Sequence, residues 1–169
     1  FGQRDENGLK ENACASFFFI AIVTIVLNVL SFILLDYLKV FLRVPDEVWS
    51  DMRSYLFVIF FGIPAVFLYN YFASFLRGIG NSTIPLLFLA ASTILNIGLD
   101  LFFVIRLKRG VIGASEATVI AQFLSGIGMA VYTLVKFPMV RSILDFRLLK
   151  KKRICEIISF SSLTCAQQS

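Results

Sequence analysis

The chain has 169 residues, of which 58% are hydrophobic and 16% charged, and its formal net charge is +5. A soluble domain with this composition would aggregate, so the ordinary soluble classes are excluded. The sequence has no histidine, which excludes His-based acid/base catalysis and His metal sites, and it has no CxxC pair that would indicate zinc or redox chemistry. We therefore predict that the protein is not an enzyme and has neither catalytic residues nor a cofactor.

Apolar stretches of about the 20 residues that a helix needs to cross the hydrocarbon core recur along the chain. They show no strict alternation of the kind that barrel strands show. The sequence therefore predicts an all-α polytopic membrane protein. The predicted spans cover about residues 12–35, 54–76, 83–105 and 112–135.

Two prolines have different expected effects on these helices. Pro64 lies inside the second span behind Gly62, where it removes a backbone donor, so we expect a hinge at these two residues. Pro85 falls in the first turns of the third span, where a missing donor costs little, and Asn81 or Ser82 is expected to cap that end.

The third span carries a polar stripe near its end. Ser92, Asn96 and Asp100 follow one another at intervals of four residues, so their side chains share one face of the helix. A carboxylate at the centre of a membrane helix costs about 2.5 to 3.5 kcal/mol on insertion scales, so we expect Asp100 to have a task and a partner. The functional interpretation is that Asp100 binds a coupling cation, and the alternative is a structural, hydrogen-bonded carboxylate.

The fourth span combines small residues with polar ones. Small residues recur every four residues, at Gly113, Ala117, Ala121 and Ser125. Such a row lets another helix approach closely. Beside it lie Thr118 and Gln122, one turn apart. If the last two spans pack as an antiparallel hairpin, these two residues would share a polar pocket with Asn96 and Asp100. Such a pocket offers the oxygen ligands that Na⁺ or a transferable proton needs, and Asp100 and Asn96 are the predicted Na⁺ ligands.

Three further polar side chains are candidates for the lining of this pocket, and each has a plainer alternative. Glu116 is a second acid at the outer end of the fourth span, where it could instead reach the interface. Asn70, like Asn28, is expected to hydrogen-bond to a neighbouring helix, as amides in spans usually do. Tyr69 could stack a cationic drug or belong to the interfacial aromatic belt. The predicted pocket lining therefore comprises Ser92, Gln122, Glu116, Asn70 and Tyr69.

The distribution of basic residues predicts the orientation in the membrane. One side would hold ten Lys and Arg residues, most of them in the tail, and the other side six. This bias favours a cytoplasmic start and end, which places Asp100 in the outer half of the membrane. The tail over 137–158 is expected to be a cytoplasmic amphipathic linker, or a plain positive-inside anchor. Nucleic-acid binding is not predicted, because basic residues beside a span are already explained. Residues 159–169 look like the beginning of another membrane helix.

The run GIPAVFLYNYFASFLRGIGNSTIPLLFLAASTILNIGLDLFFVI, followed by GVIGASEATVIAQ, resembles the multidrug and toxic compound extrusion (MATE) family. FGQRDENGLK is similar to the loop after that family's second helix, and SSLTCAQQS to the start of its seventh. The resemblance implies that 1–136 is part of a six-helix amino-terminal lobe, that 137–158 links the two lobes, and that 159–169 begins the seventh helix, which is truncated. It also implies that the parent protein supplies the missing helices and the carboxy-terminal lobe as partners.

The family resemblance implies a secondary active transporter. Such proteins export drugs and organic cations by alternating access, coupled to inward Na⁺ or H⁺ movement, in a plasma membrane that is here expected to be a prokaryotic inner membrane. The expected partners are membrane lipids and amphipathic or cationic small molecules. In one branch the cation site has an Asn and an Asp one turn apart on the fifth helix and a Thr on the sixth, which match Asn96, Asp100 and Thr118. Glu116 and Ser161 depart from the family pattern, where a small residue and a proline are common.

Two alternatives stay open at this point. A lipid-linked or polysaccharide flippase of the same superfamily would share the helical bundle, although more cationic residues would then be expected inside the spans to hold a pyrophosphate. A transport-incompetent membrane fragment is the second alternative, but it would not need the stripe of Ser92, Asn96 and Asp100.

Overall fold

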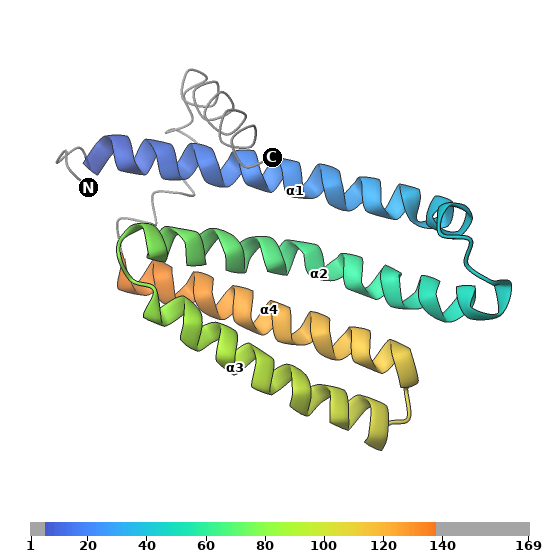
Figure 1. Cartoon of the computed structure of the whole chain (residues 1–169). Helices are drawn as coiled ribbons and strands as arrows, with labels where there is room; N and C mark the ends of the chain where they lie inside the picture. The colour runs from blue at the N-terminus through green and yellow to red at the C-terminus, as the bar shows by residue number, and fades with distance from the viewer. Residues whose placement is uncertain (1–5, 138–169) are drawn as a thin grey trace. The chain divides into compact units, whose positions relative to one another are not determined.

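A computed structural model describes residues 6–137, with side chains from residue 13 onward. These residues form helices and turns without strands, in the order α1 (Glu6–Phe41), α2 (Asp46–Gly78), α3 (Thr83–Asp100), the π-helix η1 (Leu101–Arg106) and α4 (Gly110–Lys136) (Figure 1). Four of the helical segments are long and apolar enough to cross a membrane. The prediction of an all-α polytopic membrane protein is therefore confirmed. Apart from Phe137, the predicted linker over 137–158 and the predicted helix start over 159–169 lie outside the described residues.

The chain divides into two compact units, and every contact discussed below lies within the unit Thr24–Val131. The other unit comprises Phe1–Val23 and Tyr132–Ser169, and its described part is the beginning of α1 and the end of α4. Within Thr24–Val131, the helices extend beyond the apolar runs at most ends, because polar residues at the membrane surface continue the helical hydrogen bonding. Thus α2 begins at Asp46, whereas the span predicted from the sequence begins at about residue 54.

The second half of α1 contacts α2 through residues spaced one turn apart. Asn28 donates a hydrogen bond to the Phe60 carbonyl, and Asp36 accepts one from Arg53 Nε at 3.0 Å. Between them Phe32 packs edge-to-face on three α2 rings at 5.2 to 5.5 Å between centroids, those of Phe57, Phe60 and Phe61. The interval of four residues places all of these α1 side chains on one face.

Ion pairs lie near two turns, the one between α1 and α2 and the one between η1 and α4. Lys39 pairs with Asp46 and lies over the Trp49 ring, with Nζ 5.9 Å from its centroid. Arg53 pairs with Asp36 near the same turn. Arg109 pairs with Glu116 across the turn from η1 to α4.

Close helix packing around α4 depends on small residues. A Cβ on Gly126 would lie 2.6 Å from the Ala65 carbonyl oxygen of α2, and a Cβ on Gly113 would lie 3.1 Å from Phe103 Cβ. Ser92 of α3 reaches the backbone of α4 and donates to the Ala121 carbonyl at 3.2 Å. The expected close approach along the small-residue row is therefore confirmed at Gly113 and Ala121.

The turn between α2 and α3 uses Gly80, whose φ of +85° suits glycine. Asn81 then caps α3, because its side-chain oxygen accepts a hydrogen bond from the Ile84 N–H at 3.3 Å, whereas Ser82 makes no side-chain cap. Pro85 is buried in the first turn, as expected. In α2 the helix continues through Pro64, and the proposed hinge at Gly62 and Pro64 stays a prediction.

Candidate functional site

The carboxylate of Asp100 lies at a change of helix type. The sequence analysis predicts one span over 83–105, but α3 ends at Asp100 and the chain continues as the π-helix η1 to Arg106. The wider turn is visible in the backbone bond from the Leu107 N–H to the Phe102 carbonyl, five residues back, at 3.1 Å. Hydrophobic periodicity does not distinguish the two helix types over one turn, so the sequence gives no sign of this junction. Helical segments of the π type are frequent at functional sites.

One oxygen of Asp100 is buried without a hydrogen-bond partner among the described residues. This atom is Oδ1, and the residue as a whole is half-buried on α3. A buried carboxylate oxygen without a donor is unfavourable, and binding a cation or a proton removes that penalty. The residues around this carboxylate therefore fit a Na⁺ ion or a proton.

Asn96 and Thr118 join α3 to α4 one turn before Asp100. Asn96 Nδ2 donates to Thr118 Oγ1 at 3.3 Å, and the Thr118 hydroxyl donates to the Ala114 carbonyl at 3.0 Å. These two bonds fix the orientation of the hydroxyl, and they leave the Asn96 amide oxygen free to accept a donor or bind a cation. The structure thus brings together Asn96 and Thr118, which the sequence analysis assigns to one site with Asp100.

Glu116 forms an ion pair with Arg109. Arg109 Nη1 lies 2.6 Å from Glu116 Oε2, and the Glu116 side chain is 24% exposed. The charge of this second acid is therefore balanced at the turn between η1 and α4. Within the described residues no three His, Cys, Asp or Glu side chains gather as a metal cluster.

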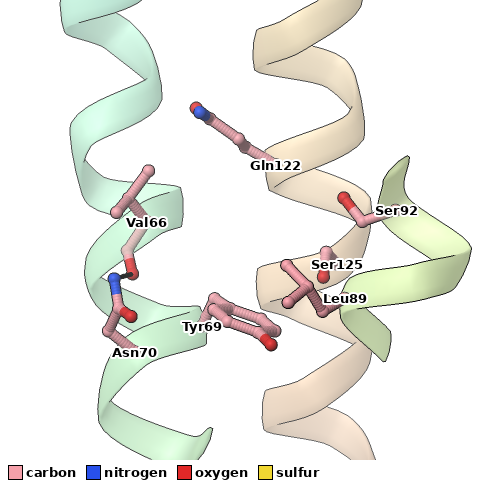
Figure 2. Close-up of a pocket in the computed structure, with 7 residues that line it drawn as sticks. All are labelled: Val66, Tyr69, Asn70, Leu89, Ser92, Gln122 and Ser125. Carbon is pink, nitrogen blue, oxygen red and sulfur yellow. Dashed lines mark hydrogen bonds between the residues drawn. The ribbon is translucent and has the colours of Figure 1, made fainter. Parts of the chain in front are cut away.

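A pocket of about 260 Å³ lies between α2, α3 and α4 (Figure 2). Four of the predicted lining residues do line this pocket, namely Tyr69, Asn70, Ser92 and Gln122. Glu116, the fifth predicted lining residue, does not. The other three lining residues, which the sequence pattern does not indicate, are Val66, Leu89 and Ser125. Of these, Ser125 belongs to the small-residue row of α4, whose spacing predicts close helix packing but not a position in the pocket.

Most polar groups of this pocket already have a partner. The Tyr69 hydroxyl donates to the Pro85 carbonyl of α3 at 2.9 Å, and Asn70 Nδ2 donates to the Val66 carbonyl of its own helix at 3.0 Å. Asn70 is thus bonded within α2, whereas Asn28 makes the expected bond to a neighbouring helix. Ser125 is 8% exposed, and its Oγ is buried without a partner among the described residues. This hydroxyl can therefore bind a ligand in the pocket.

The polar residues of α3 and α4 form two neighbouring groups. Thr118 contacts Asn96 near Asp100, whereas Gln122 lines the pocket with Ser92, and its side-chain oxygen lies against Gly62 of α2. From the sequence, Gln122 is expected to share a pocket with Asn96 and Asp100. The difference follows from the helical rise, because one turn along α4 brings its side chains beside the preceding turn of α3 in an antiparallel pair.

If Asp100 and Asn96 bind a cation, as the sequence predicts, replacing Thr118 with valine should weaken that binding. Valine keeps the shape of threonine but cannot accept the Asn96 bond, so the amide loses its fixed position. The expected loss is about fivefold in apparent affinity for Na⁺ or H⁺, the value of one hydrogen bond. Thr93→Val is the matched control, because the Thr93 hydroxyl donates to the Leu89 carbonyl within α3. Equal effects of the two substitutions on the cation affinity of the whole encoded protein would contradict the predicted site.

Comparison with known proteins identifies the family of the chain. The sequence model of the MatE family matches residues 1–102. The probable multidrug resistance protein NorM of Photorhabdus laumondii is 28% identical over 88% of this chain and 33% of its own length. The probable multidrug resistance protein YoeA of Bacillus subtilis is 31% identical over 78% of this chain and 29% of its own length.

A third relative carries a more definite name. The multidrug export protein MepA of Staphylococcus saprophyticus is 29% identical over 66% of this chain and 25% of its own length. The chain thus spans about a third or less of the relatives that it matches. No solved structure matches it significantly. Since the family model covers more than half of the residues, the chain is a multi-pass membrane protein that belongs to the MatE family.

Proposed function

We propose that this chain is part of a cation-coupled exporter of drugs and organic cations that works by alternating access. The relatives that match it are named as multidrug resistance or multidrug export proteins. The observation that carries the proposal is the Asp100 carboxylate, whose Oδ1 is buried without a partner in the described part of the chain, one turn from the Asn96–Thr118 bond. The charge of such a buried carboxylate is neutralised when it binds a cation or a proton.

In this proposal the coupling cation is carried, and the protein supplies its ligands. Asp100 and Asn96 would bind Na⁺ through their side-chain oxygens, or Asp100 would take up a proton, and Thr118 would orient Asn96. Either event neutralises the charge of the carboxylate. The helix packing that is most favourable around Asp100 therefore differs between the loaded and the empty site. The populations of the outward-open and inward-open states shift by as much as the cation prefers one of them.

The pocket between α2, α3 and α4 is the proposed contact with the exported compound. Its wall joins the Tyr69 ring and the apolar Val66 and Leu89 to a few polar groups, as is typical of sites for amphipathic small molecules. Gln122 and Ser125 offer hydrogen bonds there. A pocket of about 260 Å³ holds part of a drug, and the missing helices would complete the site.

The proposed location is the inner membrane of a prokaryote, with lipid around the described helices. Their large apolar side chains are widely exposed on α1 and α3, which suits contact with lipid or with further helices. The spans carry no Lys or Arg over 54–76, 78–99 and 117–135, so a flippase that holds a pyrophosphate is not favoured.

The experiment is to measure ethidium efflux from an efflux-deficient bacterium that expresses the whole encoded protein, under an imposed Na⁺ gradient and separately under a pH gradient. We expect efflux that depends on one of the two gradients. No efflux from well-expressed protein under either gradient would refute the proposal for this class of substrate and bring the flippase back into consideration.

Filling the pocket is expected to weaken substrate binding. Ser125→Leu places a larger apolar side chain where the buried hydroxyl lies, so the apparent affinity for ethidium should fall about tenfold while the cation dependence is unchanged. Ser31→Leu is the control, because Ser31 lies on α1 outside the pocket and its hydroxyl bonds to the Leu27 carbonyl of its own helix. An unchanged ethidium affinity in a folded Ser125→Leu variant would exclude this pocket from the substrate path.

A further inference from the structure

Pro64 leaves one carbonyl of α2 without its regular partner. In an α-helix each carbonyl accepts a hydrogen bond from the N–H four residues later, and the residue four after Phe60 is Pro64, which has no N–H. This position is in the apolar middle of the helix. An unpaired carbonyl costs several kcal/mol in hydrocarbon, so another donor is needed for the helix to continue.

Asn28 of α1 supplies a donor to this carbonyl. Its Nδ2 lies 2.6 Å from the Phe60 oxygen, and the bond is partly buried. The Phe32 ring, one turn further along α1, packs on the Phe60 ring at 5.5 Å and covers the same region with apolar surface. A side-chain amide from another helix thus takes the place of the backbone donor that proline lacks.

The same stretch of α2 is held on its other side by α4. The backbone of Gly62 lies against the Gln122 side chain, and the Ala65 carbonyl faces Gly126 so closely that a Cβ there would be 2.6 Å away. The stretch 60–65 is therefore contacted from α1 through a hydrogen bond and from α4 through close backbone packing.

We propose that Asn28 is the replacement donor for Pro64 and that it positions α1 against the proline-containing stretch of α2. The two residues form one energetic unit, although neither side chain belongs to the cation site or to the pocket. Asn28 is needed only because residue 64 is proline. The proposal is independent of which cation or drug the protein carries.

A double-mutant cycle on the whole encoded protein in detergent micelles tests this proposal. Asn28→Leu keeps a similar volume and removes the donor, so the ratio of folded to unfolded protein should fall roughly fivefold or more. Pro64→Ala restores a backbone N–H for the Phe60 carbonyl. In that background Asn28→Leu should cost less than about twofold, which is the coupling that the cycle measures.

The control in both backgrounds is Ser31→Ala. The Ser31 hydroxyl bonds to the Leu27 carbonyl of its own helix, so its removal should change the stability by the same amount with or without the proline. Equal losses from Asn28→Leu in the two backgrounds would overturn the proposal. If Pro64→Ala does not fold, the ¹³C shift of the Phe60 carbonyl decides instead. It should change on Asn28→Leu and stay constant on Ser31→Ala, and an unchanged shift in the first variant would overturn the proposal equally.

Discussion

Asp100→Asn is expected to abolish coupled efflux while leaving membrane insertion intact. Asparagine has nearly the shape of aspartate but no negative charge, so it can neither take up a proton nor balance Na⁺. The cation then no longer biases the conformational equilibrium, and its gradient is not converted into export. One positive charge that moves inward releases about 2.3 kcal/mol of free energy per 100 mV of membrane potential. For an uncharged substrate this sustains a concentration ratio of about 50 across the membrane.

The measurement is ethidium efflux under the better of the two imposed gradients, together with the amount of folded protein in the membrane. Asp51→Asn is the matched control, because Asp51 is an exposed acid near the beginning of α2 and takes no part in the cation site. Full efflux in a well-inserted Asp100→Asn variant would show that coupling does not need this carboxylate. Loss of efflux in both variants would point to a general effect of charge instead.

Gly126→Ala is expected to cost about 1 to 3 kcal/mol of stability, as insertion of a methyl group into a packed contact does. Its new Cβ would meet the Ala65 carbonyl oxygen at 2.6 Å, and this oxygen is backbone that cannot rotate away. The helices α2 and α4 would have to separate to make room.

Gly98→Ala is the matched control for this prediction. Gly98 is also a glycine within a membrane-spanning helix, but a Cβ there meets no atom within 4 Å. Alanine favours a helix by about 1 kcal/mol over glycine, so this variant should be neutral or more stable. Unfolding midpoints of the two variants in detergent check the contrast, and equal midpoints would show that the contact with Ala65 is not tight.

The polar stripe of α3 was predictable because it depends on one helix and its period. Ser92, Asn96 and Asp100 recur at an interval of four residues, and no tertiary information is needed to place them on one face. The bond from Asn96 to Thr118 required in addition that α3 and α4 pair as a hairpin, which the short turn between them favours.

Other features depend on contacts between side chains and distant backbone, and these have no local period. The end of α3 at Asp100, where η1 begins, and the approach of Gln122 to Gly62 are both of this kind. The bond from Asn28 to Phe60, in contrast, has a signal in the sequence. A proline inside a span identifies a carbonyl four residues earlier that needs a donor, and an amide in the neighbouring span is a candidate for it.

The ion pairs at the turns determine the electrostatic field that an approaching cation meets. Of the six Lys and Arg residues on the side of the membrane nearer Asp100, three pair with acids, as Lys39, Arg53 and Arg109. Unpaired, these six cations would repel a small positive ion and slow its arrival. Local pairing lowers that barrier, so in the proposed mechanism the rate at which a coupling cation would reach the carboxylate depends on salt bridges far from its proposed ligands.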